Sequence, residues 1–126
     1  MTTHVILGGN GVVGRETIAA LRAGGHSVMA VSRVSPSAPG VPHISADLRD
    51  AASAARALKG ADVAYLAVGL PYSTRVWRRD WPAIMRNAID GCLANDTHLV
   101  YFDNVYAFGR TDGPMSESTP IRPSSR

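Results

Sequence analysis

The stretch Gly8-Gly9-Asn10-Gly11-Val12-Val13-Gly14 decides the fold of this 126-residue chain. It follows the apolar run 5–7, which is typical of a buried strand, and it precedes residues whose apolar positions have helical spacing. Its glycines satisfy two spacings at once, GxxGxxG and GxGxxG. Between a strand and a helix, such glycines permit a tight bend, let backbone N–H groups approach a pyrophosphate, and let the helix pack closely on the strand. The positive end of the helix favours an anion, so the stretch predicts a dinucleotide-binding turn.

The residues of this glycine turn (residues 8–14) are the first candidates for ligand contact. The candidates are Gly8, Asn10, Gly11, Val12, Val13 and Gly14. Asn10 has two interpretations, because asparagine can contact a phosphate but also tolerates left-handed backbone angles. For the whole turn, the alternative is a glycine-rich connection between strand and helix that holds no ligand.

Outside the glycine turn, apolar runs alternate with segments of helical spacing. Strands are expected over residues 5–7, 28–31, 43–45, 63–68 and 99–102. Helices are expected over residues 13–21, over 51–58 with Asp50 as the cap, and from Asp80 onward, with Asp80 as the cap and Pro82 in the first turn. The alternation predicts an α/β Rossmann-type doubly wound parallel sheet of about five strands, in the order 3-2-1-4-5, with helices on both faces. A ligand crevice is then expected at the carboxyl ends of strands one and four.

Composition narrows the protein class. The chain is 45% hydrophobic and 18% charged, which indicates a folded domain, and no apolar run reaches the ~20 residues of a membrane helix. Its net charge of +3 comes from scattered arginines, so no nucleic-acid partner and no membrane contact are expected. The single cysteine, Cys92, favours a cytoplasmic location. The four histidines show no metal-ligand spacing, so no metal is expected. We expect a cofactor domain over 1–109 and a polar, proline-containing tail over 110–126 that leads toward a missing substrate domain.

The end of the second expected strand bears on cofactor choice. An NAD-specific Rossmann domain usually places a carboxylate there, which accepts hydrogen bonds from the ribose hydroxyls and repels a 2′-phosphate. This chain has Ser32 in that place and Arg33 beside it. Arginine offers a permanently charged, planar fork that suits phosphate oxygens. NADP is therefore the favoured cofactor and NAD the alternative, since Arg33 could also be an ordinary surface residue.

With these residues described, the chain resembles the short-chain dehydrogenase/reductase superfamily, in its extended and atypical branch of NAD-dependent epimerase/dehydratase-like proteins. The resemblance is carried by the glycine turn, by Ser32-Arg33, by residues 46–50 and by residues 99–109. It implies that the pair Asp47-Leu48 borders the adenine ring. It also implies that the segment Leu66-Ala67-Val68 runs under the ribose and the nicotinamide. A second role for Asp47, compatible with the first, is to cap the helix from the position preceding residues 50–58.

The same resemblance bears on catalysis. The family transfers hydride with a tyrosine, a lysine that lowers the pKa of that tyrosine, and a serine or threonine that polarises the substrate oxygen. Alignment on residues 107–109 places Asn104 where the serine or threonine stands, and an amide can still donate a hydrogen bond to a carbonyl. The tyrosine and lysine are expected shortly after residues 117–123, where the sequence is ending. Tyr106 is interpreted as a packing or substrate-wall residue rather than a replacement acid.

Two functions from different classes remain open. The first is the cofactor-binding half of an NAD(P)-dependent oxidoreductase or epimerase/dehydratase, an enzyme whose isolated residues 1–126 are expected to be inactive. The second is a non-catalytic NADP-binding sensor or regulatory module, which the asparagine and the absent tyrosine–lysine pair favour. A flavodoxin-like or receiver domain is a weaker third possibility, because neither needs this glycine spacing. The expected partner is an unidentified small-molecule substrate, with a homo-oligomer as a further possibility.

Overall fold

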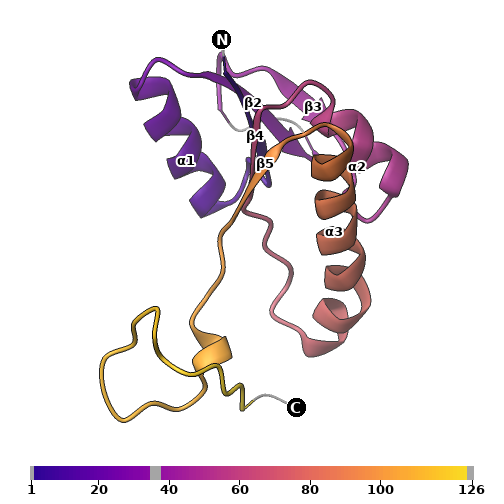
Figure 1. The fold of residues 1–126 in the computed structure, drawn as a ribbon. Coiled ribbons are helices and arrows are strands. Elements are labelled where there is room, and N and C mark those ends of the chain that lie inside the picture. Colours follow the sequence, from indigo (N-terminus) through magenta and orange to yellow (C-terminus); the bar gives the residue numbers. More distant parts are fainter. Residues whose placement is uncertain (1, 35–37, 125–126) are drawn as a thin grey trace.

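The computed structural model describes residues 2–34 and 38–124 and contains one parallel five-stranded sheet (Figure 1). The strands are β1 (Thr3–Leu7), β2 (Ser27–Ser32), β3 (His43–Ser45), β4 (Val63–Leu66) and β5 (His98–Tyr101). Their order in the sheet is β3-β2-β1-β4-β5, and every neighbouring pair is parallel. The fold class and strand order predicted from the alternation of strands and helices are therefore confirmed.

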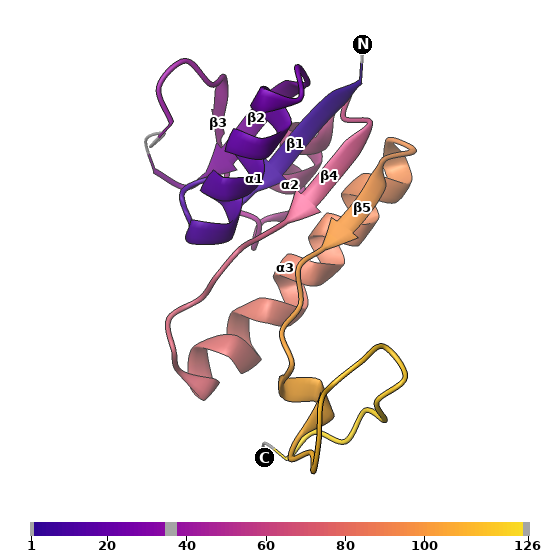
Figure 2. The same ribbon diagram turned by 90° about the vertical axis from the view of Figure 1, so that its left-hand side faces the viewer.

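Helices cover both faces of the sheet, as expected. Helix α1 (Val12–Ala23) lies on one face, whereas α2 (Ala51–Leu58) and α3 (Thr74–Ala94) lie on the other (Figures 1 and 2). Successive side chains of β1 point to opposite faces of the sheet, because side chains alternate along a strand. Leu7 belongs to the larger core beneath α2 and α3, and Ile6 belongs to the smaller core beneath α1.

The register of the sheet places the carboxyl ends of β1, β2 and β4 side by side. Leu7 at the end of β1 pairs with Val31 of β2 on one side and with Leu66 of β4 on the other. All three side chains are almost completely buried. The residues that follow these strands therefore emerge together at the carboxyl edge of the sheet, which is where ligands bind in open parallel sheets.

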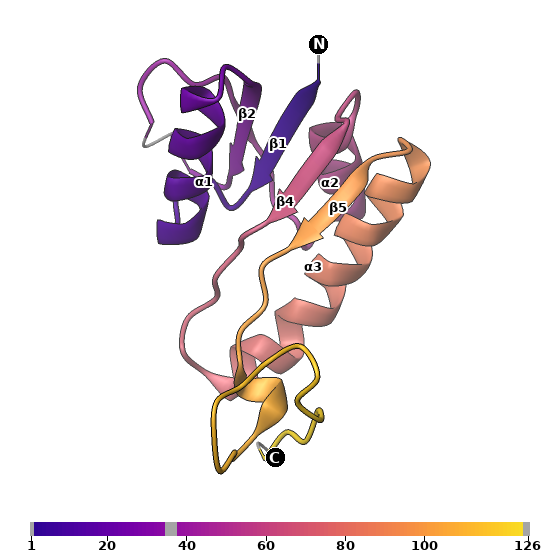
Figure 3. The same cartoon turned by 60° about the vertical axis from the view of Figure 1, so that its left-hand side comes forward.

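The start of the longest helix was predicted wrongly. Helix α3 begins at Thr74, with Ser73 as its cap, and Asp80 lies in the helix interior rather than at its start. Pro82 is likewise inside the helix, where its ring removes one backbone hydrogen bond. The first turns of α3 extend beyond the ends of the strands (Figure 3). They lack a sheet to pack against, so they carry no apolar stripe that sequence inspection could detect.

Beyond β5 the chain leaves the sheet. A single 3₁₀ turn, η1 (Tyr106–Phe108), follows, and residues 110–124 contain no helix or strand (Figure 3). This last segment folds back on η1, where the Arg122 N–H donates a hydrogen bond of 2.8 Å to the Ala107 carbonyl. Within the described part of the chain, no helix has both the length and the apolar character needed to cross a membrane.

Candidate functional site

The glycine turn is tied to the sheet by its own backbone. The N–H groups of Gly8 and Gly9 both donate to the carbonyl of Val31, over 2.9 and 3.0 Å. Gly8 has a φ of +96°, which side-chain-bearing residues rarely adopt. A Cβ at this position would also lie 2.8 Å from the carbonyl carbon and oxygen of Ala67. Both observations require glycine, and they bring the turn into direct contact with the end of β4.

Helix α1 starts at Val12, immediately after this bend. No side chain of the described residues caps this end, since Gly11 is the N-cap residue. The first helical hydrogen bond runs from the Arg15 N–H to the Gly11 carbonyl. The N–H groups at positions 12 to 14 therefore have no partner within the helix and lie at its positive end. Val12 and Val13 are exposed, so their contribution to this site is their backbone.

A cleft of about 410 Å³ opens at the carboxyl edge of the sheet, between the glycine turn and α3. Nine of the residues predicted to bind a cofactor line it. They are Gly8, Asn10, Gly11, Ser32, Arg33, Asp47, Leu48, Ala67 and Val68. Sequence analysis missed the other wall, which includes Leu70, Val76, Arg79 and Asp80. In the sequence, this wall was indicated only by the helix expected after β4, and the prediction placed the start of that helix too late.

Leu66 does not share the position of its neighbours. Its side chain is fully buried in the larger core, whereas Ala67 and Val68 line the cleft. Side chains alternate along an extended segment, and Leu66 is the last residue of β4 itself. Its side chain anchors the strand beneath the cleft, and in this structure Leu66 has no surface exposed to the cleft.

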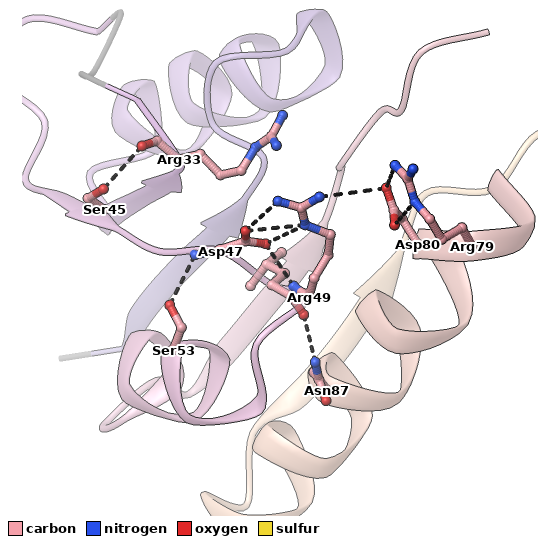
Figure 4. A network of polar contacts seen from close by, with 9 residues as sticks. Arg33, Ser45, Asp47, Arg49, Ser53, Arg79, Asp80 and Asn87 are labelled. Carbon is pink, nitrogen blue, oxygen red and sulfur yellow. Dashed lines mark hydrogen bonds and ion pairs between the residues drawn. The ribbon is translucent and has the colours of Figure 1, made fainter. Parts of the chain in front are cut away.

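Ser32 and Arg33 are placed differently at the end of β2. The Ser32 hydroxyl donates to the Val34 carbonyl over 2.8 Å and shares a 2.6 Å hydrogen bond with Nε2 of His43. This hydroxyl is thus occupied within the protein, and what Ser32 contributes to the cleft is the absence of a negative charge. The side chain of Arg33 is exposed at the cleft, while its carbonyl accepts a hydrogen bond from Ser45 (Figure 4).

Asp47 lies at the centre of a polar network that joins the loop after β3 to α3 (Figure 4). The Arg49 guanidinium binds both Asp47 carboxylate oxygens, with Nη2 at 2.6 Å from Oδ2 and Nε at 2.9 Å from Oδ1. Arg49 also reaches Asp80 at 3.8 Å, and Arg79 binds Asp80 at 2.8 Å. On the opposite side of the loop, the Asn87 amide donates to the Leu48 carbonyl over 2.8 Å. Helix α3 thereby holds the loop that the family resemblance assigns to adenine.

The network settles which aspartate caps α2. The Asp50 side chain accepts a hydrogen bond from the Ser53 N–H at 2.8 Å, so Asp50 is the cap. The Asp47 carboxylate is bound by Arg49 instead, and the second role expected for Asp47, as a helix cap, was wrong. The hydrogen bonds from the Arg49 side chain are the main reason that the pKa of Asp47 falls from 3.8 to about 2.

This lowered pKa predicts an acid dependence of stability. Because the pKa of Asp47 is lower in the folded chain than in the unfolded chain, the ion pair stabilises the fold above about pH 4. The contribution is lost as the pH falls toward about 2. The side chains of Asp47 and Arg49 are each about two-fifths exposed, so solvent screening limits the contribution of their ion pair to stability to about 1 kcal/mol or less. Urea denaturation of wild type and Asp47→Asn should differ at pH 6 and converge near pH 2. A difference that stays constant over this range would contradict the prediction.

The candidate catalytic residue does not reach the cleft. Asn104 lies in the exposed segment after β5, outside the set of described residues that line the cleft. The side-chain oxygen Oδ1 of Asn104 accepts a hydrogen bond of 2.9 Å from the Tyr106 N–H, and this bond closes a local turn. Tyr106 is exposed, and a hydrogen bond with Tyr72 raises its pKa, so it is not prepared to act as a base. The geometry thus places cofactor-type contacts together and leaves the catalytic candidate apart from them.

The histidines also lie outside the cleft. His4 is buried and shares a 3.0 Å hydrogen bond with the Tyr65 hydroxyl, and burial lowers its pKa. Across residues 2–34 and 38–124, no three histidine, cysteine or carboxylate side chains come together as a metal site would require. The chemistry of the cleft is therefore set by backbone amides, apolar walls and the arginine–aspartate network.

Comparisons with known proteins agree with this geometry. Residues 8–119 match the model of a family described as NAD(P)H-binding. No curated protein matches the chain. The match begins at the first glycine of the glycine turn and extends beyond β5, so it includes the whole cleft.

Solved structures with the same fold include three bacterial proteins. One is a short-chain dehydrogenase/reductase superfamily protein from Agrobacterium tumefaciens with bound NAD (23% identity, TM-score 0.83, 98% of this chain and 40% of that chain). Another is uronate dehydrogenase from the same organism (18% identity, TM-score 0.81, 98% of this chain and 49% of that chain). A third is UDP-N-acetylglucosamine 4-epimerase from Bacillus cereus (17% identity, TM-score 0.79, 98% of this chain and 48% of that chain).

This chain spans less than half the length of each of these structures. The likeness covers almost all of this chain and shows that these proteins share its fold. Because the family model also covers most of the sequence, this chain belongs to the NAD(P)H-binding family and is an NAD(P)-binding Rossmann domain.

Proposed function

We propose that this chain is the NADP-preferring cofactor-binding portion of an oxidoreductase or epimerase/dehydratase-like enzyme that acts on a small molecule. The observation that carries the proposal is the end of β2, where Arg33 lines the cleft and no carboxylate takes the place of Ser32. The glycine turn and the start of α1 would hold the pyrophosphate, because amides that lack a partner within the helix and a positive helix end attract anions. Ala67 and Val68 would form the floor beneath the ribose and nicotinamide.

The bound cofactor would supply the hydride, and the residues of this chain would bind and orient it. Arg33 would accept the 2′-phosphate with a charge-assisted, two-pronged contact. Leu48 and the backbone around it would border the adenine ring, in a loop whose position is set by Asn87. The apolar cleft wall formed by Leu70 and Val76 would exclude water from one side of the ligand.

Titration of the purified protein with NADP and with NAD tests this proposal. The wild type is expected to bind NADP about ten- to hundredfold more tightly, which is the value of one charge-assisted phosphate contact. Arg33→Ala should bring the two affinities close together, mainly by weakening NADP. Arg110→Ala is the matched control, because Arg110 is exposed and lies outside the described cleft residues. Equal affinities in the wild type, or a preference that survives Arg33→Ala, would contradict the proposal.

A non-catalytic NADP sensor is the second candidate function. The observation that favours it is Asn104, whose side chain closes a local turn instead of facing the cleft. The two candidates differ in turnover of the complete protein: an enzyme converts many equivalents of its substrate, with net oxidation of NADPH only if it is a reductase, whereas a sensor only binds the cofactor. A partner whose affinity for the protein changes when NADP is added would support the sensor.

A further inference from the structure

The adenosine end of the cleft contains a carboxylate that NADP would have to tolerate. Five charged side chains line the described cleft: Arg33, Arg49, Arg79, Asp47 and Asp80. Asp47 is 38% exposed, so its charge acts on whatever enters the cleft. A carboxylate near the adenosine ribose disfavours a 2′-phosphate by repulsion between like charges. Ser32 removes this repulsion at the end of β2, but Asp47 would restore it from the loop after β3.

Arg49 neutralises this carboxylate with a two-pronged contact. Its Nε and Nη2 atoms donate to the two oxygens of Asp47, at 2.9 and 2.6 Å, and the Arg49 backbone N–H donates to Oδ1 at 3.0 Å (Figure 4). The third guanidinium nitrogen, Nη1, lies 3.8 Å from Asp80. Arg49 is thus held between two carboxylates, and Asp80 is itself bound by Arg79. This arrangement leaves Arg33 as the cleft arginine with no carboxylate contact among the described residues.

Arg33 is sensitive to the state of Asp47. Both side chains line the same cleft, and the positive charge of Arg33 helps to keep the pKa of the Asp47 carboxyl low. Without Arg49, the Asp47 carboxylate would lose its two-pronged partner, and Arg33 is the other arginine whose charge acts on it. Arg33 would then be drawn toward Asp47 and would be less available to a phosphate.

We propose that Arg49 is a second determinant of the preference for NADP, and that it acts by occupying the Asp47 carboxylate so that Arg33 stays available for the 2′-phosphate. Arg49 is a positioning residue in this scheme, since it acts through Asp47 rather than on the cofactor. The inference rests on the proposed function, because it explains how a cleft that contains Asp47 accepts the extra phosphate.

Affinities for NADP and NAD, measured with Arg49→Met, test the inference. Methionine keeps much of the apolar stem of arginine and removes the charge. NADP affinity should fall about fivefold while NAD affinity changes little, and the loss should shrink in high salt because these charges are screened. Arg110→Met serves as the control, and thermal melting of each variant confirms that it is folded.

The double variant Arg49→Met/Asp47→Asn separates masking from direct contact. If Arg49 acts through Asp47, removing the carboxylate charge should restore the wild-type ratio of NADP to NAD affinity. A ratio that stays low in the double variant would overturn the inference, because Arg49 would then contact the phosphate itself. Equal weakening of both cofactors by Arg49→Met would also overturn it.

The same measurements distinguish this inference from the proposed function. A wild type without any preference for NADP would overturn the proposed function and this inference together. A wild-type preference that disappears in Arg33→Ala but persists in Arg49→Met would support the proposed function and overturn only the role of Arg49.

Discussion

Replacing Gly14 with alanine is expected to weaken cofactor binding by about tenfold or more and to destabilise the fold by about 1–3 kcal/mol. A Cβ at position 14 would overlap the carbonyl oxygen of Gly8 and would lie only 3.0 Å from the Cα of Gly9. Gly8 cannot move away, because its own N–H is bonded to Val31 and it already abuts Ala67. The turn or the first turn of α1 must therefore shift, and the amides proposed to hold the pyrophosphate shift with it.

Gly69→Ala is the matched control for this variant. Gly69 lines the same cleft, but a Cβ there would meet no described atom within 4 Å. Calorimetric titration with the preferred cofactor, together with thermal melting, measures both effects. Wild-type affinity in Gly14→Ala, or equal losses in the two variants, would show that close packing at position 14 does not shape the binding turn.

Leu58→Ala is expected to lower the free energy of unfolding by about 2–5 kcal/mol, the range for a fully buried leucine. The Leu58 side chain has no exposed surface and fills the space above Gly91, where α2 packs on α3. Its removal leaves a cavity between the two helices that hold the loop proposed to bind adenine. For a chain of this size the melting temperature should fall by about 10 °C or more.

Leu93→Ala makes the same chemical change on the surface. Leu93 is 77% exposed near the end of α3, so its loss should alter stability by less than about 0.5 kcal/mol. Chemical denaturation of both variants gives the comparison directly. Similar losses at the two positions would contradict the placement of the core between α2, α3 and the sheet.

The glycine turn could be predicted because its requirements are local. The left-handed backbone of Gly8 and the overlap that a Cβ at Gly14 would cause both arise within one bend of seven residues. Residues 8–14 follow a buried strand, and that context is visible in the sequence. The strand order also follows from sequence, because alternating strands and helices with right-handed crossovers leave few possible arrangements.

The far wall of the cleft could not be predicted in the same way. The first turns of α3 extend past the sheet, so Val76 and Arg79 show no core-facing periodicity, and Asp80 looks like a helix cap. Its actual partners, Arg79 and Arg49, become evident only when α3 lies against the loop after β3. The catalytic role of Asn104 came from alignment by family motif and stays a prediction, because in this structure its side chain closes a local turn outside the described cleft residues.

The sequence by itself determined the class of fold, the order of the strands and the conformation of the glycine turn, because each depends on apolar spacing or on glycine within one short segment. The tertiary structure alone decided the charge balance of the cleft. Asp47 is paired with Arg49, Arg49 reaches Asp80 across thirty-one positions of sequence, and Arg33 lines the cleft without a carboxylate partner among the described residues. Such pairings depend on where helices dock, and docking is set by burial of whole surfaces rather than by any local pattern.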